Sequence, residues 1–103
     1  MNHWVMDYET LINMFGGVFQ HYKTGEIKTF VVHGLRNDIL ELVKFLNSNK
    51  ENDEWHIRYN GLNFDSQITE YILRNKNLLL PLTDVEVAGL IYKKAQDIIY
   101  RQE

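Results

Sequence analysis

The segment that decides the fold is Trp4-Val5-Met6-Asp7-Tyr8-Glu9-Thr10, an apolar run that ends in two acids separated by one residue. As a strand, it points Asp7 and Glu9 to the same face, because side chains alternate with a period of two. Adjacent carboxylates both stay ionised at neutral pH only if a cation or a strong donor lies between them. A divalent metal ion meets that need, whereas a solvated strand end before a turn is the simpler interpretation of an isolated Asp-x-Glu.

Length and composition place the chain among small globular proteins. Its 103 residues predict a single domain over residues 1–103, and 45% hydrophobic with 24% charged residues excludes a disordered chain. The net charge of −3 excludes a generally basic surface, so any contact with nucleic acid must be local or assisted by metal. The absence of cysteine excludes disulfides and thiolate metal sites. We expect a soluble, cytoplasmic protein that makes no membrane contact.

The first half of the chain has the pattern of a strand meander. Asn13 and the Gly16-Gly17 pair predict a break between the first strand and the next. Residues 18–22 and 27–33 are rich in aromatic and β-branched side chains and predict two strands of a hairpin, with Gly25 at positive φ in the turn. Residues 34–37 then form a connection.

The second half has mainly helical signals. Asp38 and Glu41 have the spacing of a capping box, which predicts a helix that stops in the polar tract 47–53, taken as a loop. A short strand follows at 55–59. Beyond it, apolar residues at helical spacing predict a helix from Asp65 or Ser66 to about Arg74.

An Asn60-Gly61 hairpin between residues 55–59 and 62–68 is the alternative for that region. Residues 78–81 form an apolar stop, and a second capping box, Thr83 with Glu86, predicts a long final helix.

This order predicts an α/β fold with a ribonuclease H-like mixed sheet: a three-strand meander, a crossover helix and a fourth strand parallel to the first, the sheet being incomplete. A right-handed crossover sets the fourth strand beside the first. We therefore expect Asp65 to approach Asp7 and Glu9 at one edge of the sheet. Three such carboxylates suit a pair of Mg²⁺ ions roughly 3.5 to 4 Å apart that hydrolyse a phosphodiester.

Two motifs in these places resemble those of a known family. Asp7-Tyr8-Glu9-Thr10 is similar to the first motif of DEDD-type 3′-5′ exonucleases, and Asn60-Gly61-Leu62-Asn63-Phe64-Asp65 is similar to the second. The resemblance is to the proofreading domain of phage-type family B DNA polymerases. It implies a metal-dependent enzyme of DNA replication that trims single-stranded DNA from its 3′ end.

The resemblance also implies a role for each motif residue. Asp7 would bridge two Mg²⁺ or Mn²⁺ ions, Glu9 would bind the ion on the nucleophile side, and Asp65 would hold the second through water. Thr10, Asn60 and Phe64 would contact the 3′ end of the strand. From the residues alone, simpler roles remain open: a turn-initiating threonine, a loop-capping asparagine, a core phenylalanine and, for Asp65, an ordinary N-cap.

The family's third motif, a fourth carboxylate preceded by Tyr or His on a later helix, is not matched. Asp97 follows Lys93 and Lys94, and Tyr92 lies five residues before it. We therefore expect the chain to be the N-terminal part of an exonuclease domain, weakly active or inactive alone. Its partner would be the rest of a polymerase chain or a second subunit.

A rival hypothesis belongs to another class of protein. A sheet that lacks its next strand exposes backbone groups that can pair with another chain. The chain would then be a small, non-catalytic α/β protein-interaction module.

Overall fold

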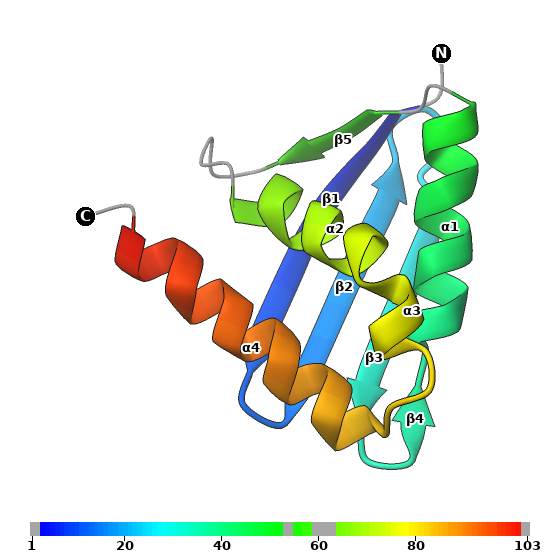
Figure 1. Cartoon of the computed structure of the whole chain (residues 1–103). Helices are drawn as coiled ribbons and strands as arrows, with labels where there is room; N and C mark the ends of the chain where they lie inside the picture. The colour runs from blue at the N-terminus through cyan, green and yellow to red at the C-terminus, as the bar shows by residue number, and fades with distance from the viewer. Residues whose placement is uncertain (1–2, 53–54, 59–63, 102–103) are drawn as a thin grey trace.

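The computed structural model describes residues 3–52, 55–58 and 64–101, which form a mixed α/β fold (Figure 1). Four antiparallel strands come first, and helices that pack on the sheet follow. The strands are β1 (His3–Leu11), β2 (Met14–His21), β3 (Ile27–His33) and β4 (Arg36–Asn37). The helices are α1 (Ile39–Glu51), α2 (Phe64–Arg74), α3 (Lys76–Leu79) and α4 (Asp84–Arg101).

One further strand, β5 (Trp55–Arg58), lies between α1 and α2 in the chain and pairs with β1 in parallel. The register runs from His3 opposite Trp55 to Met6 opposite Arg58. The order across the sheet is therefore β4-β3-β2-β1-β5. Parallel neighbours need a long crossover, and α1 lies in that connection.

The helices lie on one face of the sheet (Figure 1). Side chains alternate along β1, and those that face the helices are buried: Trp4, Met6 and Tyr8. The strands β2 and β3 add four side chains to the same core: Phe15, Phe19, Phe30 and Val32. The helices complete the core with the buried side chains Leu42, Leu46, Ile68, Ile72, Val87 and Ile91. The opposite face of the described sheet carries exposed side chains, so the molecule has two layers and one open sheet face.

The predicted break at Gly16-Gly17 is wrong, because both residues lie inside β2 and pair with β1 and β3. Gly17 is opposite Tyr8, and a Cβ at Gly17 would come within 3.0 Å of two atoms of that ring. Here glycine provides room for packing and not a turn. The turn predicted at Gly25 is confirmed, since its φ is 74°.

The loop predicted over residues 47–53 is also wrong, because α1 continues to Glu51 and is followed by Asn52 as its C-cap. The polar tract still has an inward-facing side, on which Asn49 is buried. A helix face can therefore extend into a sequence with few apolar residues when one polar side chain is accommodated against the core.

The capping box predicted at Asp38 is not formed. Asp38 is the N-cap residue of α1, but its side chain makes no cap hydrogen bond. Its Oδ2 instead accepts from the backbone N–H of Val31 at 3.0 Å and from Nε of Arg36 at 2.7 Å. Ile39 N–H donates to Oδ1 of Asn37 at 3.2 Å. The connection predicted at 34–37 thus contains a short strand, β4, tied to β3 by this aspartate.

Two later predictions are confirmed, whereas the apolar stop predicted over residues 78–81 begins inside the short helix α3, which ends at Leu79. The helix expected from Asp65 or Ser66 begins at Phe64 and ends at Arg74. The second capping box is present: Thr83 N–H donates to Oε1 of Glu86 at 3.1 Å, and Glu86 N–H donates to Oγ1 of Thr83 at 3.3 Å. Within the described ranges, no helix is both long and apolar enough to cross a membrane.

Candidate functional site

The acidic pair of β1 lies on the open face of the sheet. Asp7 and Glu9 are exposed, and the buried Tyr8 between them points to the helices. Across the sheet, Asp7 is opposite Val18 of β2, and Glu9 is opposite Gly16. Among the residues that the structure describes, neither carboxylate has a hydrogen bond or an ion pair. Their charge is therefore available to a cation from solution.

Asp65 lies on the other side of β1. It is in the first turn of α2 and only 3% exposed. The same helix holds Thr69, whose Oγ1 is 2.6 Å from the hydroxyl of Tyr8. Burial raises the pKa of Tyr8, the Thr69 hydrogen bond opposes that rise, and the nearby charge of Asp65 adds to it. Asp65 is thus a neighbour of the core-facing Tyr8.

The structure therefore does not bring the three predicted ligands together. The described residues include all three, and among them no group of three or more His, Cys, Asp or Glu side chains is placed to hold a metal ion. The expected convergence at one edge fails because alternation sends Asp7 and Glu9 away from the face on which α2 packs. In the described structure the three carboxylates therefore do not form a two-metal centre by themselves, and only Asp7 and Glu9 share a face.

The residues implied to contact DNA are also separated. Thr10 is half-buried and points to the same face of β1 as Tyr8, opposite to the face that carries Asp7 and Glu9. Phe64 is half-buried and packs against the hydrophobic core, which supports its structural role. Asn60 lies outside the described residues.

Asp97, the residue nearest in pattern to a third motif, has a structural role in α4. Its Oδ1 is 3.1 Å from Nε of Arg101, and its Oδ2 is 4.0 Å from Nζ of Lys94. These are pairs along one exposed helix, at spacings of four and three residues. They give Asp97 no connection with the acids of β1.

His21 is a buried polar residue with a structural role. Its Nδ1 accepts from the backbone N–H groups of Lys23 and Thr24, both at 3.2 Å. The ring of Trp4 meets it edge-on, with centroids 4.9 Å apart. The imidazole of His21 therefore holds the turn after β2 in place.

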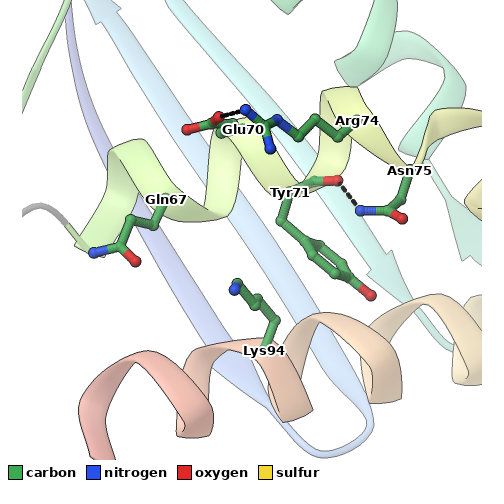
Figure 2. A pocket seen from close by; sticks show the side chains of 6 residues that line it. All are labelled: Gln67, Glu70, Tyr71, Arg74, Asn75 and Lys94. Carbon is green, nitrogen blue, oxygen red and sulfur yellow. Dashed lines mark hydrogen bonds and ion pairs between the residues drawn. The ribbon is translucent and has the colours of Figure 1, made fainter. Parts of the chain in front are cut away.

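A groove between α2 and α4 was not predicted from the sequence (Figure 2). It consists of two hollows of about 320 and 300 Å³ that share Tyr71 and Lys94, and we call it the α2–α4 groove. The first hollow is lined by Gln67, Glu70, Tyr71, Arg74, Asn75 and Lys94, and the second by Tyr71, Leu90, Lys93, Lys94 and Asp97. Apart from Asn75, which follows α2, its residues come from two helices that only the tertiary fold brings side by side, so no local motif marks it.

A scan against protein-family models gives no match, and searches of the curated proteins and of the solved structures give none either.

Proposed function

We propose that this chain carries the first two acidic motifs of a metal-dependent 3′-5′ exonuclease of the DEDD type, on a ribonuclease H-like sheet. Asp7 and Glu9 are the side chains of this chain that we assign to divalent cation binding, with Mg²⁺ or Mn²⁺ as the ion. The substrate class is the 3′ end of single-stranded DNA.

One observation carries the proposal. β5 is parallel to β1 and immediately beside it, and the chain leaves β5 toward α2, whose first turn contains Asp65. Asp65 thus lies in the helix that follows the strand beside β1, although it is far from Asp7 and Glu9 in the sequence. A meander, a crossover through α1 and a parallel strand beside the first are the arrangement that the motif resemblance implies.

The exposed pair supports the assignment of the cation. Two carboxylates on one face of one strand, with no partner among the described residues, favour a hard cation with oxygen ligands. The pair alone supplies two ligands, and Asp65 is buried on the helix side. We therefore expect cation binding by this chain to be weak and its nuclease activity to be slight or absent.

The test is paramagnetic broadening by Mn²⁺ of the amide resonances of the ¹⁵N-labelled chain. We expect broadening centred on β1 at Asp7 and Glu9 and on Gly16 and Val18 of β2, reversed by EDTA. The double variant Asp7→Asn/Glu9→Gln should weaken this binding by roughly tenfold or more, because it removes both charges that attract the ion.

The matched control is Glu41→Gln/Glu51→Gln, which removes two exposed acids from α1 and should leave the broadening unchanged. A 5′-labelled single-stranded oligonucleotide with Mg²⁺ then tests for activity. Broadening that avoids β1, or that survives Asp7→Asn/Glu9→Gln, contradicts the proposal.

A protein-interaction module is the second candidate, and the open sheet face favours it. Leu11, Val18 and Ile27 are large apolar side chains exposed there, at 46%, 45% and 60%. Exposed apolar residues grouped on one face are typical of interaction surfaces. Absence of Mn²⁺ binding at β1 would put this candidate first.

A further inference from the structure

The α2–α4 groove contains more cationic donors than its own acids can occupy. Arg74 places Nη2 2.6 Å from Oε1 of Glu70, which uses one N–H of the five on its guanidinium group. The Arg74 side chain is otherwise 76% exposed. Most of its hydrogen-bonding capacity therefore faces solvent.

The two lysines of α4 are less engaged still. Nζ of Lys94 is 4.0 Å from Oδ2 of Asp97, at the limit of an ion pair, and Asp97 lies closer to Arg101. Lys93 has no ion pair among the described residues. Three cations thus face two carboxylates in the groove, a local excess of positive charge in a chain whose net charge is −3.

Tyr71 adds an aromatic surface beside Lys94 (Figure 2). Its ring extends from α2 toward α4, and Lys94 extends from α4 toward α2 (Figure 2). The ring is half-buried, and burial raises the pKa of its hydroxyl, so the group remains a neutral donor at physiological pH. Gln67 and Asn75 contribute amides at the margins of the first hollow.

A ring flanked by cations selects a particular kind of ligand. The cations favour phosphate, and the ring offers a face on which a base can stack whatever its sequence. Two adjoining hollows that share Tyr71 and Lys94 suit an extended chain better than a compact ion.

We propose that the α2–α4 groove binds single-stranded nucleic acid, with phosphates at Arg74, Lys93 and Lys94 and a base against Tyr71. The site belongs to the helix layer, whereas the acidic pair is on the open face of the sheet. It uses no metal ion, so it is independent of the proposed nuclease activity. It also places nucleic-acid binding in a local basic groove, as the overall negative charge requires.

The test is fluorescence anisotropy of a labelled oligothymidylate of about ten nucleotides, within the range of single-strand site sizes. The titration is done at low salt in EDTA, so that metal binding at Asp7 and Glu9 has no influence. We expect Lys93→Gln/Lys94→Gln to weaken binding about tenfold, because two phosphates are then no longer neutralised. The slope of log K against log salt should fall by about 1.4, at roughly 0.7 for each of these phosphates.

Two substitutions at Tyr71 test whether its ring stacks against a base. Tyr71→Phe keeps the ring and should bind like the wild type, whereas Tyr71→Ala should weaken binding about fivefold or more. The matched control, Lys44→Gln/Lys50→Gln, removes two exposed lysines from α1 and should bind like the wild type. Thermal unfolding checks that each variant is folded.

Three results would overturn the proposal: no binding of the oligonucleotide by the wild-type chain, an equal loss in the α1 control, or binding of poly-glutamate in preference to the oligonucleotide. The last result would identify the groove as a site for acidic peptides. A failure here leaves the Mn²⁺ result at β1 unaffected, so the two proposals are tested separately.

Discussion

Tyr8 is the residue at which the two layers of the fold meet. Its hydroxyl is 2.6 Å from Oγ1 of Thr69 in α2, and its ring packs against Phe15 and Phe19, with centroids 5.2 and 5.9 Å away. Because neighbours in a strand point to opposite faces, the orientation that puts Tyr8 in the core puts Asp7 and Glu9 outside it. The same tyrosine therefore explains both the packing of α2 on the sheet and the exposed acidic pair.

The raised pKa of Tyr8 predicts that the protein loses stability at alkaline pH. The pKa of Tyr8 in the folded chain is raised above the unfolded value of about 10. Below about pH 10 the Tyr8 hydroxyl is protonated in both the folded and the unfolded chain, so its contribution to the free energy of unfolding does not change with pH. Above about pH 10 this hydroxyl readily loses its proton only in the unfolded chain. Stability should then fall, with a slope that approaches about 1.4 kcal/mol per pH unit for this group.

The variant Tyr8→Phe tests this prediction. It should flatten the alkaline fall without abolishing it, because the pKa of Tyr71 is also raised. Near neutral pH it should lower the free energy of unfolding by about 1 kcal/mol, since the hydrogen bond with Thr69 is removed. Urea unfolding at several pH values gives both quantities, and an unchanged alkaline slope would refute the assignment to Tyr8.

At the scale of the element, β2 shows that two adjacent glycines can have different roles. Gly17 is buried under the Tyr8 ring, whereas the nearest atoms to a Cβ at Gly16 are 3.7 and 3.9 Å away, an ordinary van der Waals separation. We predict that Gly17→Ala lowers the free energy of unfolding by about 1 to 3 kcal/mol through overpacking. Gly16→Ala should be neutral or raise it by up to about 1 kcal/mol, because glycine weakens a strand. Denaturant unfolding of both variants measures these changes. A larger loss of unfolding free energy for Gly16→Ala than for Gly17→Ala would contradict the placement of Gly17 under the Tyr8 ring.

Elements with local signals could be predicted from the sequence, and those set by tertiary neighbours could not. The start of α4 follows from the box of Thr83 and Glu86, which lie within one turn. The start of β2 could not be predicted, since Gly16-Gly17 has the composition of a turn, whereas its strand conformation comes from pairing with β1 and β3. Only Gly17 is required to be small, because it lies under the Tyr8 ring. The end of α1 and the strand β4 likewise depend on packing against the core and pairing with β3.

The same distinction applies to the site. Period-two alternation correctly predicts that Asp7 and Glu9 share a face. Motif spacing does not reveal on which side of β1 the helix carrying Asp65 packs, and that choice separates the predicted ligands. The α2–α4 groove was missed because Tyr71 and Lys94 are far apart in sequence and meet only through helix packing.

At the scale of the whole molecule, the fold has a sheet with two unlike faces. One face is covered by helices and contributes the buried aromatics, and the other carries Asp7, Glu9 and several exposed apolar side chains. The proposed cation site and the candidate protein-interaction surface would both use the open face, whereas the proposed nucleic-acid groove would use the helix layer. Substitutions on the open face can therefore change binding without changing the core.

Substitutions on the two faces of the sheet should differ in their effect on stability. Val18→Thr and Ile27→Thr, on the open face, should each change the free energy of unfolding by no more than about 0.5 kcal/mol, because both side chains are exposed and neither belongs to the core. Phe19→Ala, one position along β2 from Val18 but on the core face, should lower it by about 3 to 5 kcal/mol, since a fully buried ring is removed. Equilibrium unfolding in urea measures all three. A loss at Val18 or Ile27 comparable with that at Phe19 would mean that the open face is covered in solution, by a second copy of the chain if the loss depends on protein concentration.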